Sequence, residues 1–164
     1  MSRAFVKEGT GELEPLPDLP ISGHPNYVTP RGLADLRARL VARQADLAAL
    51  RARVERLDRL PEAAAERDIR YLEARLRSAI LVEAALPHSS GVAFGHRVVV
   101  QMGEAQSVFE IVGEDEADAA LGRIAPQSPL ARALMGAMVG DVVIWRRPSG
   151  AVELEVVAIE PGGL

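Results

Sequence analysis

The sequence predicts an α+β protein in which a helical hairpin precedes a small antiparallel sheet domain. Between residues 29 and 85, apolar residues recur at steps of three and four, the spacing of a helix with a narrow apolar seam. Beyond residue 91 the pattern changes to short alternating segments separated by turn residues, which is typical of strands. One segment of this second half begins with Ser128-Pro129 and predicts a single short helix.

Composition excludes several classes of protein. The 164 residues are 48% hydrophobic and 26% charged, an ordinary balance for a soluble chain of one or two small domains. Cysteine is absent, which excludes disulfides and thiolate metal sites and fits a cytoplasmic location. No signal peptide is visible and no apolar run approaches the roughly 20 residues of a membrane span, so we expect no membrane association.

Charge is divided unevenly along the chain. The net charge is -4, but residues 29–85 carry twelve arginines against nine acids, whereas residues 86–164 carry five against ten. A basic arm on an acidic body indicates polar contacts with a partner. A nucleic-acid binder would usually show a strongly basic domain with exposed aromatics, and this chain has neither.

The N-terminal half predicts a flexible leader and then an antiparallel coiled-coil hairpin. Residues 1–28 are rich in proline and glycine, which favours an extended or disordered segment. In residues 29–85, Thr29 is the expected N-cap of a first helix that runs to about Leu60, a rod of about 45 Å. A second helix is expected from about Glu62 to Ala85. Heptad positions of the first helix are Leu33, Leu36, Leu40, Leu47, Leu50, Val54 and Leu57, with Arg43 as the exception.

The C-terminal half predicts a compact domain at residues 92–164, reached through a linker at 86–91. Four strands are expected, at 97–102, 107–112, 141–147 and 152–159. An acidic loop at 113–118 and a helix that begins at Pro129 separate the second strand from the third. About 75 residues of this kind can hold one modest core.

Three stretches of the sequence resemble the Gre family of bacterial transcription elongation factors. YVTPRGLADLRARL resembles the start of the family's first coiled-coil helix, and FGHRVVVQ resembles the first strand of its C-terminal domain. The most specific match runs from IVGEDEAD through SPLARALMG to VGDVV and a P-x-G turn. The resemblance implies an FKBP-like C-terminal domain, an antiparallel sheet with one short helix.

The resemblance also implies a partner. In the family, the C-terminal domain docks on a coiled coil of the β′ subunit at the rim of RNA polymerase's secondary channel, and the hairpin enters the channel, where indirect contact with nascent RNA follows. We therefore expect a monomeric accessory factor and no enzyme. The matching docking residues are Asp115, Asp118, Ser128, Pro129 and Arg132. Each also has a structural reading, since Ser128 caps a helix, Pro129 begins it and the acidic loop is a soluble turn.

The end of the hairpin departs from the family. Cleavage factors carry a tip motif G-D-x-x-E-N-A-[ED]-Y, which is missing here, and the hairpin is shorter. No intrinsic cofactor is expected. Glu62, Glu66 and Asp68 are the remaining candidates for holding a Mg²⁺ ion shared with the polymerase active site, since Mg²⁺ prefers oxygen ligands. Alternatively, Glu62 is a helix cap, and Glu66 and Asp68 pair with neighbouring arginines.

Three functions remain open from the sequence. The first is a regulator of transcription elongation that acts by occupying the secondary channel. The second is a factor that stimulates transcript cleavage through a non-standard acidic tip. The third is an interaction module with a different partner, like family relatives with short hairpins that are linked to nucleotide metabolism.

Overall fold

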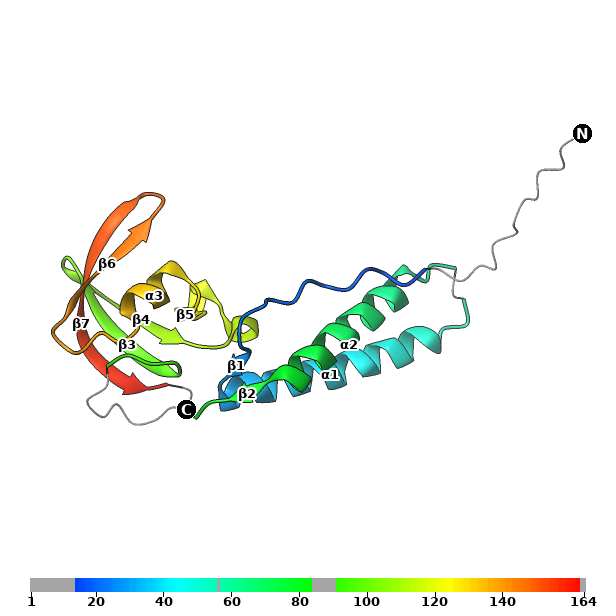
Figure 1. Ribbon diagram of the computed structural model, residues 1–164. Helices are drawn as coiled ribbons and strands as arrows, with labels where there is room; N and C mark the ends of the chain where they lie inside the picture. Colours follow the sequence, from blue (N-terminus) through cyan, green and yellow to red (C-terminus); the bar gives the residue numbers. More distant parts are fainter. Residues whose placement is uncertain (1–13, 56, 84–90, 163–164) are drawn as a thin grey trace, which may run out of the picture.

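The computed structural model describes residues 14–55, 57–83 and 91–162, and the predicted leader and linker fall partly outside these residues. A helical hairpin and a curled-sheet domain, which we call the head, are joined end to end (Figure 1). The predicted α+β class, with helices first and the sheet second, is confirmed.

The hairpin is shorter than predicted. Helix α1 (Pro30–Arg51) begins as expected, because the Thr29 hydroxyl accepts a hydrogen bond from the Gly32 N–H at 2.9 Å. It ends well before Leu60, so its 22 residues span about 33 Å instead of 45 Å. Helix α2 (Leu60–Ser78) begins two residues before the predicted Glu62 and stops short of Ala85.

The missing turns of α1 have a physical cause. Val54 and Leu57 continue the heptad in sequence, yet their side chains are 102% and 94% exposed. Because α2 begins only at Leu60, a longer α1 would extend past its partner helix and leave these seam residues uncovered. The chain turns instead, and the Asp58 carboxylate accepts a hydrogen bond from the Leu60 N–H at 2.9 Å.

The hairpin seam is buried toward the loop at Leu47, Ala63 and Ala65, and near the head in a second cluster. Leu36 and Leu72 are almost fully buried together with Val28. The residues that pack around this cluster come from both helices and from the C-cap of α2: Leu33, Leu40, Tyr71, Leu76 and Ala79. Aliphatic contacts of the predicted seam therefore hold the two helices together over their first turns from the head.

A short parallel strand pair closes the base of the hairpin and was not predicted. Strand β1 (Tyr27–Val28) pairs with β2 (Ile80–Leu81), which directly follows α2. The buried Asn26 amide donates hydrogen bonds to the Arg75 carbonyl at 2.8 Å and to the Ser78 hydroxyl at 3.1 Å. These bonds satisfy a carbonyl at the end of α2 that the helix leaves unpaired.

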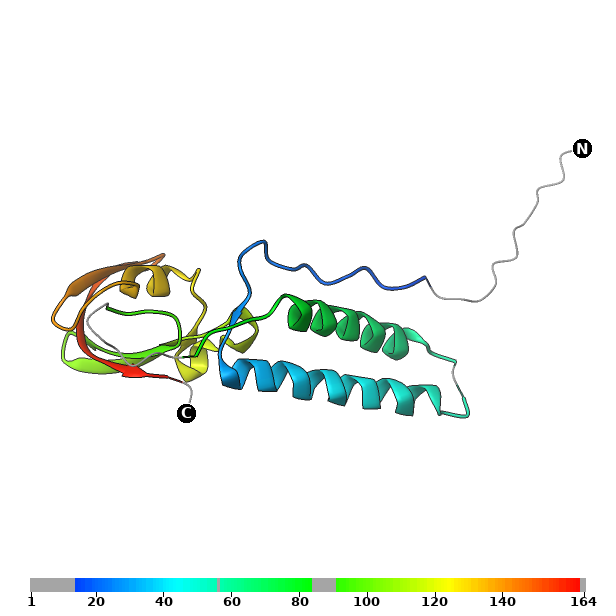
Figure 2. The ribbon, with the colours of Figure 1, turned by 60° about the horizontal axis from the view of Figure 1, so that its bottom comes forward.

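Residues 14–26, which we call the strap, run extended along α2 toward the loop of the hairpin (Figure 2). Arg70 of α2 fixes the strap: its guanidinium donates to the Asp18 carboxylate at 2.6 Å and to the Leu16 carbonyl at 2.8 Å. The extended course agrees with the proline-rich composition, while flexibility of the leader stays a prediction.

The head is a five-stranded sheet, one strand more than predicted. The strands are β3 (His96–Met102), β4 (Ala105–Ile111), β5 (Arg123–Ile124), β6 (Val142–Arg147) and β7 (Gly150–Pro161), in the order β5-β4-β3-β7-β6. The four predicted strands pair antiparallel, as expected, and the additional strand β5 pairs parallel with β4. Two residues are too few to show alternation, which is why β5 escaped notice.

One short helix covers the inner face of the sheet, as predicted. Helix α3 (Pro129–Leu134) buries Leu130 and Leu134 against the strands. The completely buried strand residues of this core are Val98, Val100, Ile111, Leu154 and Val156. Between β4 and β5 the acidic loop folds into two 3₁₀ turns, η1 (Glu114–Glu116) and η2 (Ala119–Leu121).

Candidate functional site

The contact between hairpin and head is a network of charged and polar side chains, which we call the elbow. It joins Thr29, Arg31, Tyr71 and Arg75 of the hairpin to Glu110, Glu114, Asp115 and Glu116 of the head. Turn η1 is central to the network because it supplies three consecutive carboxylates. The acidic loop is therefore much more than a solvated turn.

Arg75 forms the deeper half of the elbow. Its side chain is 1% exposed, and its guanidinium donates to Asp115 at 2.5 Å and to Glu114 at 3.3 Å. The Tyr71 hydroxyl donates to the other oxygen of Asp115 at 2.6 Å. A buried charge is tolerated only when it is paired and hydrogen-bonded, so the folded hairpin needs these carboxylates of the head.

Glu116 forms the other half, at the first turn of α1. Its carboxylate accepts hydrogen bonds from the Thr29 hydroxyl at 2.5 Å and from Arg31 at 2.6 Å. Arg31 also donates to Glu110 at 2.9 Å. Burial works against the charge of Arg31, but the two carboxylates outweigh it and raise its pKa. The helix dipole favours the negative charge of Glu116 at this end of α1.

Gly32 is required by this arrangement. A Cβ at this position would lie 2.5 Å from an oxygen of Glu116. In most helices a glycine-to-alanine change stabilises by roughly 0.5–1 kcal/mol. Here we expect Gly32→Ala to lower the free energy of unfolding by about 1–3 kcal/mol, because the carboxylate must move out of its hydrogen bonds. Urea unfolding measures the change.

Gly23→Ala is the matched control for that change. A Cβ at Gly23 in the strap meets no atom within 4 Å, so its free energy of unfolding should stay close to that of the parent chain. A Gly32→Ala protein that is more stable than the parent would contradict the described packing of Glu116 against α1.

Tyr71 gives the elbow a dependence on alkaline pH. Burial and the hydrogen bond to Asp115 raise the pKa of its phenol from 10.0 to about 12. Below pH 10 the phenol is protonated in both folded and unfolded chains, and its stabilising effect is fully present. Between pH 10 and 12 the unfolded chain loses this proton more readily, so stability falls as pH rises.

We therefore expect the unfolding free energy to decline more steeply over pH 10–12 in the parent chain than in Tyr71→Phe. Urea titrations at several pH values measure the difference. Tyr27→Phe changes the chain's other tyrosine, which lies outside the elbow, and should keep the parent's slope. Equal slopes for the parent and Tyr71→Phe would count against the Tyr71–Asp115 bond.

The structure separates the five residues matched to the family's docking surface. Asp115 is engaged in the elbow and its side chain is 10% exposed. Asp118 is exposed, and its carboxylate caps η2 by accepting from the Ala120 N–H at 3.0 Å. Ser128 caps α3 by accepting from the Ala131 N–H at 3.2 Å, and Pro129 and Arg132 lie exposed on that helix.

Ser128, Pro129 and Arg132 therefore lie together at the start of α3, with Ser128 as its N-cap. Asp115 and Asp118 instead border a hollow of about 330 Å³ between η1 and α1. Arg39 of α1 and Arg123 of β5 line the same hollow. The five residues matched to the docking surface thus lie in two places: three at the start of α3 and two beside the elbow.

The carboxylates near the end of the hairpin do not form an open cluster. Glu62 is 5% exposed and has a partner. Glu66 pairs with Arg51 at 2.7 Å, and Asp68 pairs with Arg43 at 2.8 Å and Arg67 at 2.9 Å. The predicted alternative of arginine pairing is therefore observed for Glu66 and Asp68.

This arrangement does not fit a Mg²⁺ site. A magnesium ion needs several oxygen ligands in an octahedral arrangement, and arginines occupy two of the three candidate carboxylates. Among residues 14–55, 57–83 and 91–162, no three His, Asp or Glu side chains are grouped so as to hold a metal ion. The described helices also include none that is long and apolar enough to span a membrane.

Sequence reasoning missed the elbow. Arg31, Tyr71 and Arg75 lie 39 or more positions away from their acidic partners, and such pairings leave no periodic signal. The one available signal was the charge pattern of the sequence: Glu114–Glu116 are three consecutive acids, and the hairpin has an excess of arginine.

Comparison with known proteins finds relatives of the head. Residues 87–161 match the model of the transcription elongation factor GreA/GreB C-terminal domain. Transcription elongation factor GreA of Pseudomonas putida is 39% identical over 98 residues, which are 58% of this chain and 61% of the relative. GreA of Pseudomonas aeruginosa is 43% identical over 97 residues, 57% and 61% of the two chains. The matched segment thus spans about three fifths of the length of these relatives.

Solved structures give a weaker likeness. GreA factor homolog 1 of Thermus thermophilus aligns with a TM-score of 0.39 at 25% identity, covering 84% of this chain and 99% of that one. GreA/GreB from Nitrosomonas europaea aligns with a TM-score of 0.40 at 18% identity, covering 82% and 98%. These scores are too low to equate the whole-chain arrangements.

The fold and the family match together define a two-part protein, a helical hairpin fixed to a head of the kind found in transcription elongation factors. Over residues 87–161 the head is similar in sequence to the C-terminal domain of transcription elongation factors GreA/GreB.

Proposed function

We propose that this protein regulates transcription elongation by binding bacterial RNA polymerase at its secondary channel. The head would dock on the β′ rim of the channel, and the hairpin would enter. The observation that carries the proposal is the elbow, whose buried Arg75 pairs with Asp115 and holds the hairpin out from a GreA/GreB-like head as a fixed arm. A fixed arm can be aimed by docking the head alone.

The exposed surface of α3 supports this docking. Pro129 and Arg132 are free to meet a partner, and Ser128 holds the first turn that presents them. Asp118 adds an exposed carboxylate. Asp115 would act indirectly, by fixing the hairpin. The protein would act as a monomer in the cytoplasm, where its partner is found.

The distal end favours occupancy of the channel over cleavage. Stimulated cleavage needs carboxylates that can hold a second Mg²⁺ beside the polymerase's own metal. Glu66 and Asp68 are neutralised by arginines, and the arm is about 12 Å shorter than the sequence predicts, 33 Å instead of 45 Å. The protein is thus proposed as an accessory factor, with any RNA cleavage carried out by the polymerase.

A stalled, backtracked elongation complex tests the proposal. With Mg²⁺ present, we expect the protein to bind the complex and alter elongation without shortening the RNA. Shortened RNA that disappears in Glu62→Ala or Glu66→Ala would instead establish the cleavage-factor alternative.

A polymerase pull-down tests the choice of partner. We expect the parent chain to retain polymerase and Pro129→Ala or Asp118→Ala to retain less of it. If no form retains polymerase, both transcription functions are wrong, and a different partner, in nucleotide metabolism, becomes the better hypothesis.

A further inference from the structure

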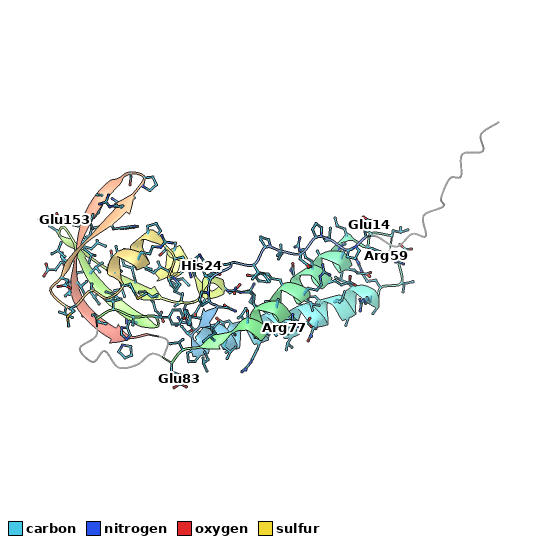
Figure 3. All side chains as sticks on the ribbon, viewed as in Figure 1. Glu14, His24, Arg59, Arg77, Glu83 and Glu153 are labelled. Atoms are coloured by element: carbon cyan, nitrogen blue, oxygen red, sulfur yellow. The ribbon has the colours of Figure 1, made fainter. Side chains whose placement is uncertain are left out.

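The strap follows the hairpin from base to distal end. His24 lies at the head end of the strap, and Glu14 and Arg59 both lie at the far end of the hairpin (Figure 3). The hairpin loop and the strap therefore reach the same end of the molecule (Figures 1 and 2). A partner that receives the hairpin must also accommodate the strap or displace it.

Contacts at three levels fix the strap to the hairpin. At the base, strand β1 continues the strap and pairs with β2. In the middle, Leu19 borders a hollow of about 360 Å³ together with Tyr71 and Leu72. Farther along, Arg70 binds the Asp18 carboxylate and the Leu16 carbonyl at 2.6 and 2.8 Å.

The strap changes the chemistry of the face that it covers. Arg70 of α2 pairs with Asp18 of the strap, and the two side chains are 39% and 75% exposed. The strap has no lysine or arginine, and Glu14 is also exposed. The four prolines of the strap, Pro15, Pro17, Pro20 and Pro25, restrict its backbone. An extended segment of this kind therefore loses little conformational entropy when it is bound.

We propose that the strap stays clamped to α2 in the bound state and forms one of the hairpin's contact faces. Its exposed carboxylates and prolines fit a positively charged protein wall. This inference rests on the proposed function, because it identifies the wall as the inside of the polymerase channel. Charge complementarity selects the wall, since the strap carries the exposed acids Glu14 and Asp18 and no basic residue, whereas its removal would uncover Arg70.

Single cysteines test the proposal cleanly because the chain has none of its own. A cross-linking probe is attached to Glu14→Cys, Leu57→Cys or His24→Cys in the full chain, and each is bound to RNA polymerase. We expect probes at 14 and 57 to label the same polymerase segments, and the probe at 24 to label different ones. Adding Arg70→Ala should abolish the labelling from 14 and leave that from 57 unchanged.

The contrary outcomes are distinct. In the first contrary outcome, the probe at residue 57 labels the channel, but the probe at residue 14 labels either no polymerase segment or the same segments as the probe at residue 24. The strap is then released on binding, and this inference is wrong. If none of the three probes labels polymerase, the proposed function fails and the inference fails with it.

The charge of the strap has its own test. Glu14→Gln should weaken polymerase binding severalfold at low salt and have less effect at high salt, because salt screens exposed charges. Glu83→Gln, an exposed acid at the base, is the matched control and should bind like the parent. Equal binding by Glu14→Gln and the parent at low salt would overturn the choice of a cationic wall.

Discussion

Arg75→Ala is expected to lower the free energy of unfolding by about 3–5 kcal/mol, the cost of breaking a buried ion pair by removing one partner. Its guanidinium is the cation nearest to Asp115 and Glu114, and its side chain is 1% exposed. Without it, two carboxylates of the head would face the hairpin base with Tyr71 as a neutral donor. Urea unfolding of the full chain measures the loss.

Arg77→Ala is the matched control because Arg77 lies two residues away on α2 and is exposed (Figure 3). The free energy of unfolding of Arg77→Ala should stay within about 0.5 kcal/mol of the parent value, as for most surface substitutions. If both variants lost the same small amount, the elbow would not be a stabilising contact.

Leu36→Ala is expected to cost about 2–5 kcal/mol, the range for large-to-small changes in a packed core. Leu36 is 1% exposed and packs with Leu72 and Val28 at the base of the hairpin. Removing its side chain leaves a cavity in a small cluster that has few residues to refill it. Thermal or urea unfolding measures the effect.

Val54→Ala tests the same apolar seam just beyond Arg51, the residue at which α1 ends. Val54 occupies a heptad position in sequence, but its side chain is 102% exposed, so its truncation should be nearly neutral. A loss comparable to that of Leu36→Ala would show that α1 continues beyond Arg51 and that the sequence-based length was right.

Local signals predicted much of the fold. Thr29-Pro30 at the start of α1 and Ser128-Pro129 at the start of α3 are caps whose hydrogen bonds are observed. Strand β3 and the turn at Gly103 also follow from alternation and turn chemistry. Each of these features depends on residues that are neighbours in the sequence.

Features set by distant contacts were missed. Residues 52–55 and 57 include good helix formers and the in-phase apolar Val54 and Leu57, but the partner helix does not extend far enough to bury these side chains, and α1 ends at Arg51. Strands β1, β2 and β5 contain two residues each and depend on their partners. The pairing of Arg75 with Asp115, 40 positions apart, has no counterpart in the local pattern.

The central claim is that the elbow holds the hairpin at a fixed orientation to the head. The distance between spin labels at Val41→Cys on α1 and Glu153→Cys on β7, measured by pulsed electron paramagnetic resonance, tests it most directly. We predict one narrow distance distribution for the full chain and a broad one when Arg75→Ala is added. A broad distribution in the chain with Arg75 intact would contradict the claim.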